Sequence, residues 1–250
     1  MTKNNIVIVG SGEAGGRAAV ALRQKKYEGS ITIIGEEAYL PYQRPPLSKG
    51  FLANNFDESR LFIKSSDYYR NNNIKHISNK KISTLNIDGQ YVSSGNSKYK
   101  YDSLIIATGS KVKKLPFDYH TKHVCYLRNL IDAQKIKRYL KTKRRLVIIG
   151  GGYIGLEVAS MAIKNGLDVT IVESENRLMT RAVCPEMSEF LRKKHKENGV
   201  NFLFSRIIKA IKDDNNQTKI ICDDNSEIEC DFIVAGIGIE PNTELANNAG

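Results

Sequence analysis

The sequence predicts an α/β fold with two Rossmann-like dinucleotide-binding domains. Two observations predict it. An apolar run at Ile6–Val9 ends in closely spaced glycines, and the same pattern returns after Leu146–Ile149. In each copy, a helix-compatible segment follows the glycines, and a second apolar strand follows that helix and leads to an acidic residue. A strand, a glycine turn and a helix in this order hold the pyrophosphate of a dinucleotide.

The first copy begins with a predicted strand at Asn5–Val9 and a predicted helix at Glu13–Lys25. Gly10 permits the tight turn between them. Gly12 lets phosphates approach the backbone, and Gly15 lets the helix pack closely on the strand. The free N–H groups and the dipole at the helix start attract an anion. The sequence therefore predicts a pyrophosphate site at this turn.

An acid at the end of the second strand binds ribose hydroxyls in this fold. After the predicted strand at Ser30–Ile34, Glu36 is the first candidate, with Glu37 as the alternative and a solvated loop acid as the functionless reading. The segment Pro41–Lys49 follows, and its adjacent prolines predict a rigid, non-strand backbone. This backbone presents Arg44 and Lys49, unless it is a surface linker with incidental charges.

Further elements follow from apolar patterning and turn residues. The sequence predicts a short helix at Ser65–Asn73, β segments at Ile74–Ile87 and Gln90–Ser94, a strand at Tyr101–Thr108 and a helix at Asn129–Leu140. Thr108 and Gly109, which end that strand, are small enough to allow close approach of a ligand.

The second copy is a complete mononucleotide-binding unit. Gly150, Gly152 and Gly155 form its turn, a helix runs to about Lys164, and a strand at Asp168–Val172 ends at Glu173. Beyond it, the sequence predicts a helix at Pro185–Asn198, short strands at Val200–Phe204, Ile207–Ile211, Lys219–Cys222 and Glu227–Glu229, and an apolar strand at Asp231–Ala235. Two such mononucleotide-binding units in one sequence predict that the protein binds two dinucleotides.

Composition and residue spacing argue against several classes of protein. With 250 residues and 41% hydrophobic residues, the chain has the composition of a globular protein. No apolar run reaches about 18 residues, so no membrane span is expected. The first strand starts too early for a secretory signal, so the cytoplasm is the expected location. Cys125, Cys184, Cys222 and Cys230 have no metal-ligand or redox-pair spacing, and reduced thiols without a metal are expected.

The net charge of +11 allows three interpretations. Nucleic-acid binding lacks an accompanying motif and is not expected. A solvated, lysine-rich surface is the simplest interpretation. The third is electrostatic steering of an acidic protein partner.

Together these motifs resemble the FAD-dependent pyridine nucleotide-disulfide oxidoreductase superfamily, and most closely its ferredoxin reductase branch, which includes rubredoxin, putidaredoxin and rhodocoxin reductases. The run Arg44–Lys49 is the most specific match. The matching segments are Gly10–Gly15, Pro41–Lys49, Thr108–Gly109, Gly150–Glu157, Val172–Arg181 and Gly236–Asn242.

The resemblance implies an FAD-binding domain over residues 1–110, an inserted NAD-binding domain over 111–235, and a return to the FAD domain over 236–250. It implies that Gly10, Gly12, Ala14, Gly15, Glu36, Arg44, Lys49, Thr108 and Gly109 bind FAD, and that Gly150, Gly152, Gly155 and Glu173 bind NADH. Ile154, Arg181 and Gly238 lie in the matched motifs and complete the cofactor-binding set.

The resemblance also implies an ion pair between Lys49 and Glu157 beside the flavin, and these two are the catalytic candidates. The alternative is that Glu157 is simply a favourable acid in the first turn of a helix. The implied reaction is hydride transfer from NADH to the flavin, followed by single-electron transfer to an acidic ferredoxin or rubredoxin. Glu173 favours NADH over NADPH, although Arg177 could partly offset this by reaching a 2′-phosphate.

A second functional hypothesis comes from the end of the sequence. Members of the resembled family continue past Gly250, with a further strand and a C-terminal domain over the flavin. The chain is therefore expected to be C-terminally truncated with an incomplete FAD domain. The alternative function is a non-catalytic fragment that binds NADH but not FAD.

Overall fold

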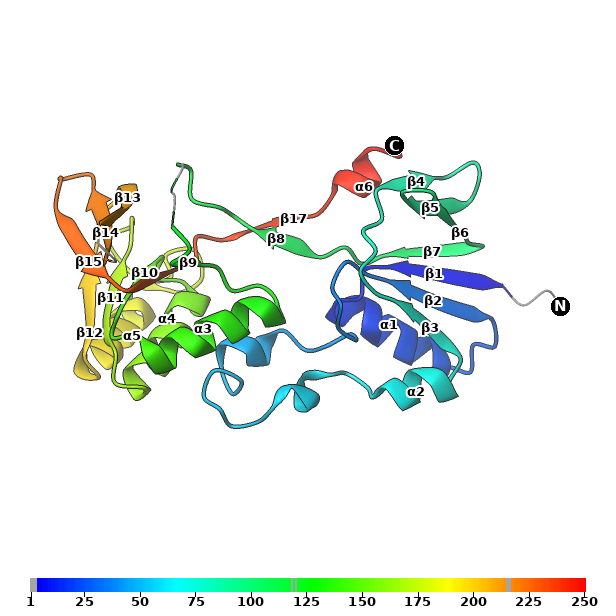
Figure 1. Cartoon of the computed structure of the whole chain (residues 1–250), viewed down its shortest axis with the longest axis horizontal. Helices are drawn as coiled ribbons and strands as arrows, with labels where there is room; N and C mark the ends of the chain where they lie inside the picture. Colours follow the sequence, from blue (N-terminus) through cyan, green and yellow to red (C-terminus); the bar gives the residue numbers. More distant parts are fainter. Residues whose placement is uncertain (1–3, 118, 120, 215–216) are drawn as a thin grey trace. The chain divides into compact units, whose positions relative to one another are not determined.

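The computed structural model describes residues 4–117, 119, 121–214 and 217–250, and it confirms the predicted α/β fold (Figure 1). Internal contacts divide the chain into two units. Unit 1 comprises the chain up to Arg44, together with Asp57–Lys111 and Glu240–Gly250. Unit 2 comprises Pro45–Phe56 and Val112–Ile239.

Unit 1 is built on a parallel sheet with the strand order β3-β2-β1-β7. The strands are β1 (Asn5–Val9), β2 (Ser30–Ile34), β3 (Ile74–Ile77) and β7 (Ser103–Ile106), and the helices are α1 (Glu13–Gln24) and α2 (Ser66–Asn71). A small antiparallel sheet contains β4 (Thr84–Asn86), β5 (Tyr91–Ser94) and β6 (Ser97–Lys100). The central strand β1 is apolar throughout its interior because both faces of a parallel sheet are covered.

Unit 2 repeats this plan with the order β12-β11-β10-β16-β9, again all parallel. The strands are β9 (Val124–Cys125), β10 (Arg145–Ile149), β11 (Asp168–Val172), β12 (Val200–Leu203) and β16 (Phe232–Ala235). The helices are α3 (Leu130–Thr142), α4 (Tyr153–Lys164) and α5 (Pro185–Glu197). A three-stranded antiparallel sheet adds β13 (Ile208–Asp214), β14 (Gln217–Cys222) and β15 (Glu227–Cys230). The four strands β12-β11-β10-β16 therefore correspond to β3-β2-β1-β7 of unit 1.

The remaining elements are short. The strands β8 (Ser110–Val112) and β17 (Ile239–Pro241) pair with each other where the chain leaves one unit and returns to it. Two 3₁₀ helices, η1 (Pro45–Ser48) and η2 (Glu58–Leu61), and the helix α6 (Glu244–Asn247) complete the described chain.

The short strands β6, β8, β9 and β17 were not predicted, and two larger features also differ from the sequence prediction. The β segment predicted over Ile74–Ile87 is broken, because Asn79 adopts a positive φ of 54° and the chain re-enters strand structure only at β4, in another sheet. The segment Pro45–Phe56 was expected within the first domain, yet its contacts group it with unit 2. The reason is apolar packing, since Leu52 is 1% exposed inside the main core of unit 2.

Candidate dinucleotide-binding sites

The first glycine turn joins β1 to α1. Gly10 has φ 114°, and a Cβ there would lie 2.1 Å from the carbonyl oxygen of Ala107. A Cβ on Gly15 would lie 2.0 Å from the carbonyl oxygen of Gly10. Gly12 is the N-cap of α1 and supplies no side-chain cap, so the first-turn N–H groups stay open to a ligand. Ala14 is exposed in that first turn.

The two acids after β2 behave differently. Glu37 receives hydrogen bonds from Tyr42 and from Arg44, whose guanidinium also lies over the Tyr42 ring at 5.2 Å. Glu36 is exposed, directly after Gly35. Arg44 also lies beside the turn, with Nη2 3.7 Å from a Cβ built on Gly12. Glu37 therefore orients Arg44, and Glu36 remains the candidate for ribose.

Thr108 and Gly109 are fixed by the end of the chain. The Thr108 hydroxyl donates to the carbonyl oxygen of Asn242, and the Asn242 amide donates back to the carbonyl oxygen of Thr108, both at 2.8 Å. The Asn242 N–H donates to the Gly109 carbonyl oxygen at 2.9 Å. Asn242 was not among the predicted site residues, because no local pattern indicates a contact across 134 positions.

The second glycine turn repeats the first. Gly150 has φ 101°, and its N–H donates to Val172 at 2.8 Å, just as Gly10 donates to Ile34. A Cβ on Gly155 would lie 2.2 Å from the Gly150 carbonyl oxygen. Gly152 caps α4 without a side chain, and a Cβ there would meet no atom within 4 Å. This open position leaves room for a pyrophosphate.

Glu173 closes over the second turn. Its Oε2 accepts the N–H of Gly151 at 2.7 Å, and its Oε1 accepts the N–H of Glu175 at 2.9 Å. Register makes Gly35 the equivalent of Glu173, because each donates its N–H to the adjacent edge strand. Glu36 therefore lies one residue beyond the position of Glu173, and the two acids are not equivalent.

The loop after β11 is held from inside by Arg177. Its Nη1 donates to the carbonyl oxygen of Val183 at 2.9 Å, and its Nη2 donates to that of Thr180 at 3.0 Å. Met179 adopts φ 51° and donates its N–H to Gly151. Arg177 is thus engaged by the loop, and the alternative that it reaches a 2′-phosphate would require it to leave these carbonyl groups. The exposed Arg181 is the cation that the loop presents.

Lys49 and Glu157 form an ion pair at 2.9 Å within unit 2. Ser48, only 2% exposed, donates its hydroxyl to the other Glu157 oxygen. Lys49 Nζ also lies 3.4 Å from the carbonyl oxygen of Pro45. Glu157 is beyond the first turn of α4, and two partners hold it, which disfavours the interpretation as a simple helix-start acid. Ser48 was not among the predicted site residues, although its place beside Lys49 in a rigid turn was a usable signal.

Two other predicted residues lie apart from these clusters. Ile154 is 38% exposed at the start of α4. Gly238 has φ 117° and accepts a hydrogen bond from the Lys113 N–H at 3.0 Å, beside the start of β17. Their roles toward a cofactor stay predictions.

The cysteines form no redox pair among the described residues, where all four are free. Burial raises the pKa of Cys125 to about 11 and that of Cys230 to about 12, so both are protonated thiols at neutral pH. Over the same described ranges, no cluster of potential ligands could hold a metal ion. Nor does any helix there have the length and apolarity needed to cross a membrane.

Both turns fit a dinucleotide. Each turn leads into a 12-residue helix whose N-cap is a glycine, so no side chain caps or covers the helix N-terminus. Each turn also has a carboxylate nearby. Over residues 4–250, the sequence matches the family described as pyridine nucleotide-disulphide oxidoreductase. The chain belongs to this family. The predicted resemblance is therefore confirmed at the family level.

Curated relatives within this family are similar over nearly all of the chain. It is 40% identical to rubredoxin-NAD(+) reductase of Ectopseudomonas oleovorans over 98% of the chain and 64% of that protein. It is 36% identical to putidaredoxin reductase of Pseudomonas putida over 99% of the chain and 60% of that protein. The chain thus spans about three fifths of the length of these relatives.

Solved structures of two reductases are also similar to the chain. The putidaredoxin reductase in its covalent complex with putidaredoxin has a TM-score of 0.96 at 36% identity, covering 100% of this chain and 62% of that one. A ferredoxin reductase from Rhodopseudomonas palustris has a TM-score of 0.94 at 33% identity, covering 99% of this chain and 62% of that one.

Proposed function

We propose that the chain is the dinucleotide-binding part of an FAD-dependent NADH:ferredoxin or NADH:rubredoxin reductase, with FAD at the turn of unit 1 and NADH at the turn of unit 2. The observation that carries the proposal is the duplicated turn, with open helix N-termini at Gly12 and Gly152. Relatives named as reductases of rubredoxin and putidaredoxin support it.

In the first site, the open amides after Gly12 would hold the FAD pyrophosphate, and Glu36 would hold the ribose. Arg44 carries a positive charge beside the same turn and is oriented by Glu37. Thr108 and Gly109, fixed by Asn242, offer a second rigid backbone edge. These are the residues that would bind and orient the flavin.

In the second site, Gly150, Gly152 and Gly155 would bind the NADH pyrophosphate and Glu173 its ribose. The carboxylate of Glu173 disfavours a 2′-phosphate, because two negative charges about 4 Å apart repel by about 4 kcal/mol at an effective dielectric of 20. Arg177 cannot relieve this repulsion while it holds the loop carbonyl groups. The expected substrate is therefore NADH.

A bound flavin would supply the redox chemistry, which is uptake of a hydride and release of single electrons. The role that we propose for Lys49 is to present a fixed positive charge where negative charge develops on the reduced flavin. Glu157 and Ser48 would keep that ammonium in place through the contacts within unit 2. With no cysteine pair among the described residues, a one-electron carrier is the proposed acceptor. The net charge of +11 suits an acidic one.

Separate blockade of the two turns tests the proposal. Gly12→Glu places a carboxylate in the first turn, and Gly152→Glu does the same in the second. FAD and NADH binding are then measured by ultrafiltration on the purified chain and on both variants. We expect Gly12→Glu to abolish only FAD binding and Gly152→Glu to abolish only NADH binding. Loss of the same ligand in both variants, or of neither, contradicts the assignment.

A further inference from the structure

Strand β12 is an open edge of the unit 2 sheet. Among the described residues, no strand pairs with its outer side. The Leu203 carbonyl oxygen accepts the Glu173 N–H at 2.8 Å, so Leu203 directs its main-chain groups to β11. Because alternate residues of a strand direct these groups to opposite sides, the N–H and C=O of Phe202 point outward. Such an edge can pair with another extended chain.

Unit 1 provides an internal comparison. Its edge strand β3 holds the position equivalent to β12, since Gly35 donates to Ile77 as Glu173 donates to Leu203. Natural edge strands are commonly protected from pairing by charged residues, especially lysine. β3 contains an exposed lysine, Lys75, whereas β12 contains neither a charged residue nor proline.

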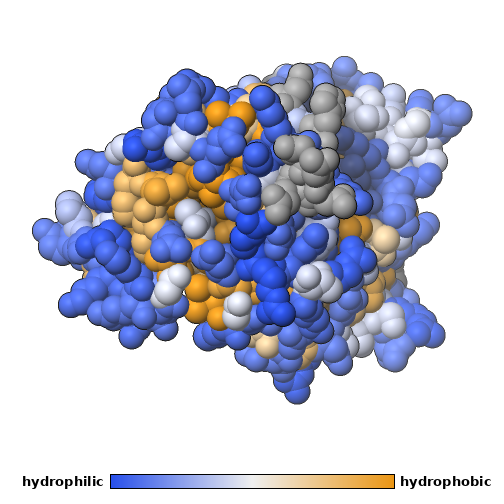
Figure 2. All heavy atoms as spheres, turned by 60° about the vertical axis from the view of Figure 1, so that its left-hand side comes forward, coloured by the Kyte–Doolittle hydropathy of each residue, from blue (hydrophilic) through white to orange (hydrophobic). Residues whose placement is uncertain are grey.

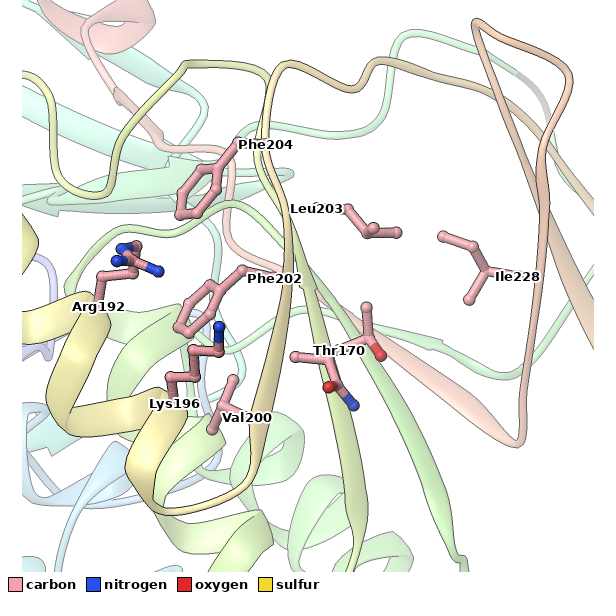
Figure 3. A pocket seen from close by; sticks show the side chains of 9 residues that line it. Thr170, Arg192, Lys196, Val200, Phe202, Leu203, Phe204 and Ile228 are labelled. Atoms are coloured by element: carbon pink, nitrogen blue, oxygen red, sulfur yellow. The ribbon is translucent and has the colours of Figure 1, made fainter.

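A groove of about 520 Å³ runs along β12 (Figure 3). Phe202 and Phe204 point to the α5 side, where their rings stack at 5.5 Å, while Leu203 points to the opposite side, toward Ile228. Leu203 is 36% exposed, and Ile207 beyond it is 59% exposed. The surface seen from this side of the molecule shows hydrophobic residues gathered within a hydrophilic border (Figure 2). The edge therefore offers apolar surface on both of its faces.

The charge around the groove is positive. Arg192 and Lys196 of α5 line it, and none of its lining residues is acidic. Arg192 pairs with Glu189 at 2.6 Å, whereas Lys196 forms no ion pair within the described part of the chain. Lys193 and Lys194 are exposed on the same helix. A second copy of this chain would bring like charges together, so an acidic occupant is favoured.

We propose that β12 is the docking site for an extended acidic segment of a partner protein. The segment pairs with the outward main-chain groups of Phe202, places apolar side chains against the groove, and sets its carboxylates near Lys196. This inference uses no cofactor and does not depend on the proposed reductase function.

The test uses the full chain and two model peptides of about six residues, one alternating valine with glutamate and the other valine with lysine. Affinity is measured by fluorescence anisotropy, and hydrogen exchange locates the bound peptide. We expect only the acidic peptide to bind, and we expect the bound peptide to slow hydrogen exchange of the Phe202 amide. Lys196→Glu should weaken binding about fivefold or more, as expected for a lost ion pair. The matched control Lys75→Glu, on the equivalent edge of unit 1, should leave the affinity unchanged.

Three results would overturn the proposal. The first is absence of binding, or equal binding of both peptides. The second is an acidic peptide that protects other segments but not β12, or whose affinity Lys196→Glu does not alter. The third is protection of the Phe202 amide by self-association without peptide, seen as a concentration-dependent dimer in sedimentation, because it would make a second copy the occupant.

Discussion

Single side chains distinguish the two glycine turns, although both turns follow one backbone path. In unit 1 a serine, Ser11, faces a glycine, Gly35, and a Cβ on Gly35 would lie 1.8 Å from the serine Oγ. In unit 2 the sizes are reversed, with Gly151 facing Glu173. The small residue opposite each larger one keeps the turn closed. Because of this exchange, a carboxylate, that of Glu173, accepts the N–H of Gly151 in the second turn, whereas Ser11 and Gly35 provide no carboxylate in the first.

Two glycines of the second turn have separable roles. At Gly152 the φ of −83° and the empty space around a built Cβ make alanine acceptable to the fold. Gly152→Ala should therefore keep the melting temperature but weaken NADH binding about tenfold, because a methyl group enters the phosphate position. Gly155→Ala should instead cost about 1–3 kcal/mol of stability, since its Cβ would lie 2.2 Å from a carbonyl oxygen. Calorimetry and nucleotide titration of both variants check this. Equal effects on stability would contradict it.

Nucleotide selectivity depends on Glu173. Glu173→Gln keeps an oxygen that can accept the Gly151 N–H but removes the charge. NADPH affinity should then rise, by up to roughly a thousandfold, while NADH affinity changes much less. Fluorescence titration with both nucleotides measures the ratio. Glu175→Gln, which neutralises an exposed neighbour, is the control and should leave the ratio as it is. An unchanged ratio in Glu173→Gln would refute the role of this carboxylate.

Regular elements with strong patterns were predictable, and those defined by tertiary contacts were not. The apolar runs of β1, β2 and β11 gave their bounds directly. The break after β3 depends on the left-handed conformation of Asn79, which has no periodic signal. Likewise, the Lys49–Glu157 pair was expected from family resemblance. Ser48 stands next to Lys49 in the sequence, but its hydrogen bond to Glu157 of α4 depends on tertiary contacts.

The start of β10 is tied to β16 by one carboxylate. Asp231 accepts the N–H groups of Arg144 and Arg145 at 2.8 and 3.0 Å. Burial opposes ionisation, but the hydrogen bonds from Arg145 and Arg144 outweigh it and lower the pKa of Asp231 below its ordinary value of 3.8. Its stabilising effect is therefore present above this value and is lost as the pH falls through the native pKa.

Asp231→Asn should accordingly destabilise the protein at pH 7, and the difference from the unmodified chain should shrink below pH 3.8. Urea unfolding at both pH values measures it. Asp88→Asn, an exposed turn residue of unit 1, serves as the control and should have little effect at either pH. A difference that is constant with pH would exclude the ionised carboxylate as the cause.

At the scale of the whole molecule, one folding plan is used twice, with four parallel strands in the same relative order. The sequence predicted this duplication from two apolar runs that end in closely spaced glycines, each followed by a helix, a strand and an acidic residue. It did not predict that Pro45–Phe56 packs with unit 2, because that assignment depends on the burial of Leu52 among residues distant in sequence. The catalytic candidate Lys49 is thereby held by the unit for which we propose NADH binding.

The central claim is that the first turn binds FAD and the second binds NADH, which reduces it. The most direct measurement is the visible absorption spectrum of the purified chain after incubation with FAD and removal of the excess, before and after anaerobic addition of NADH. The account predicts a retained flavin band that NADH bleaches and NADPH bleaches far less. A colourless protein that still binds NADH, or a flavin band that NADH leaves unchanged, would contradict it.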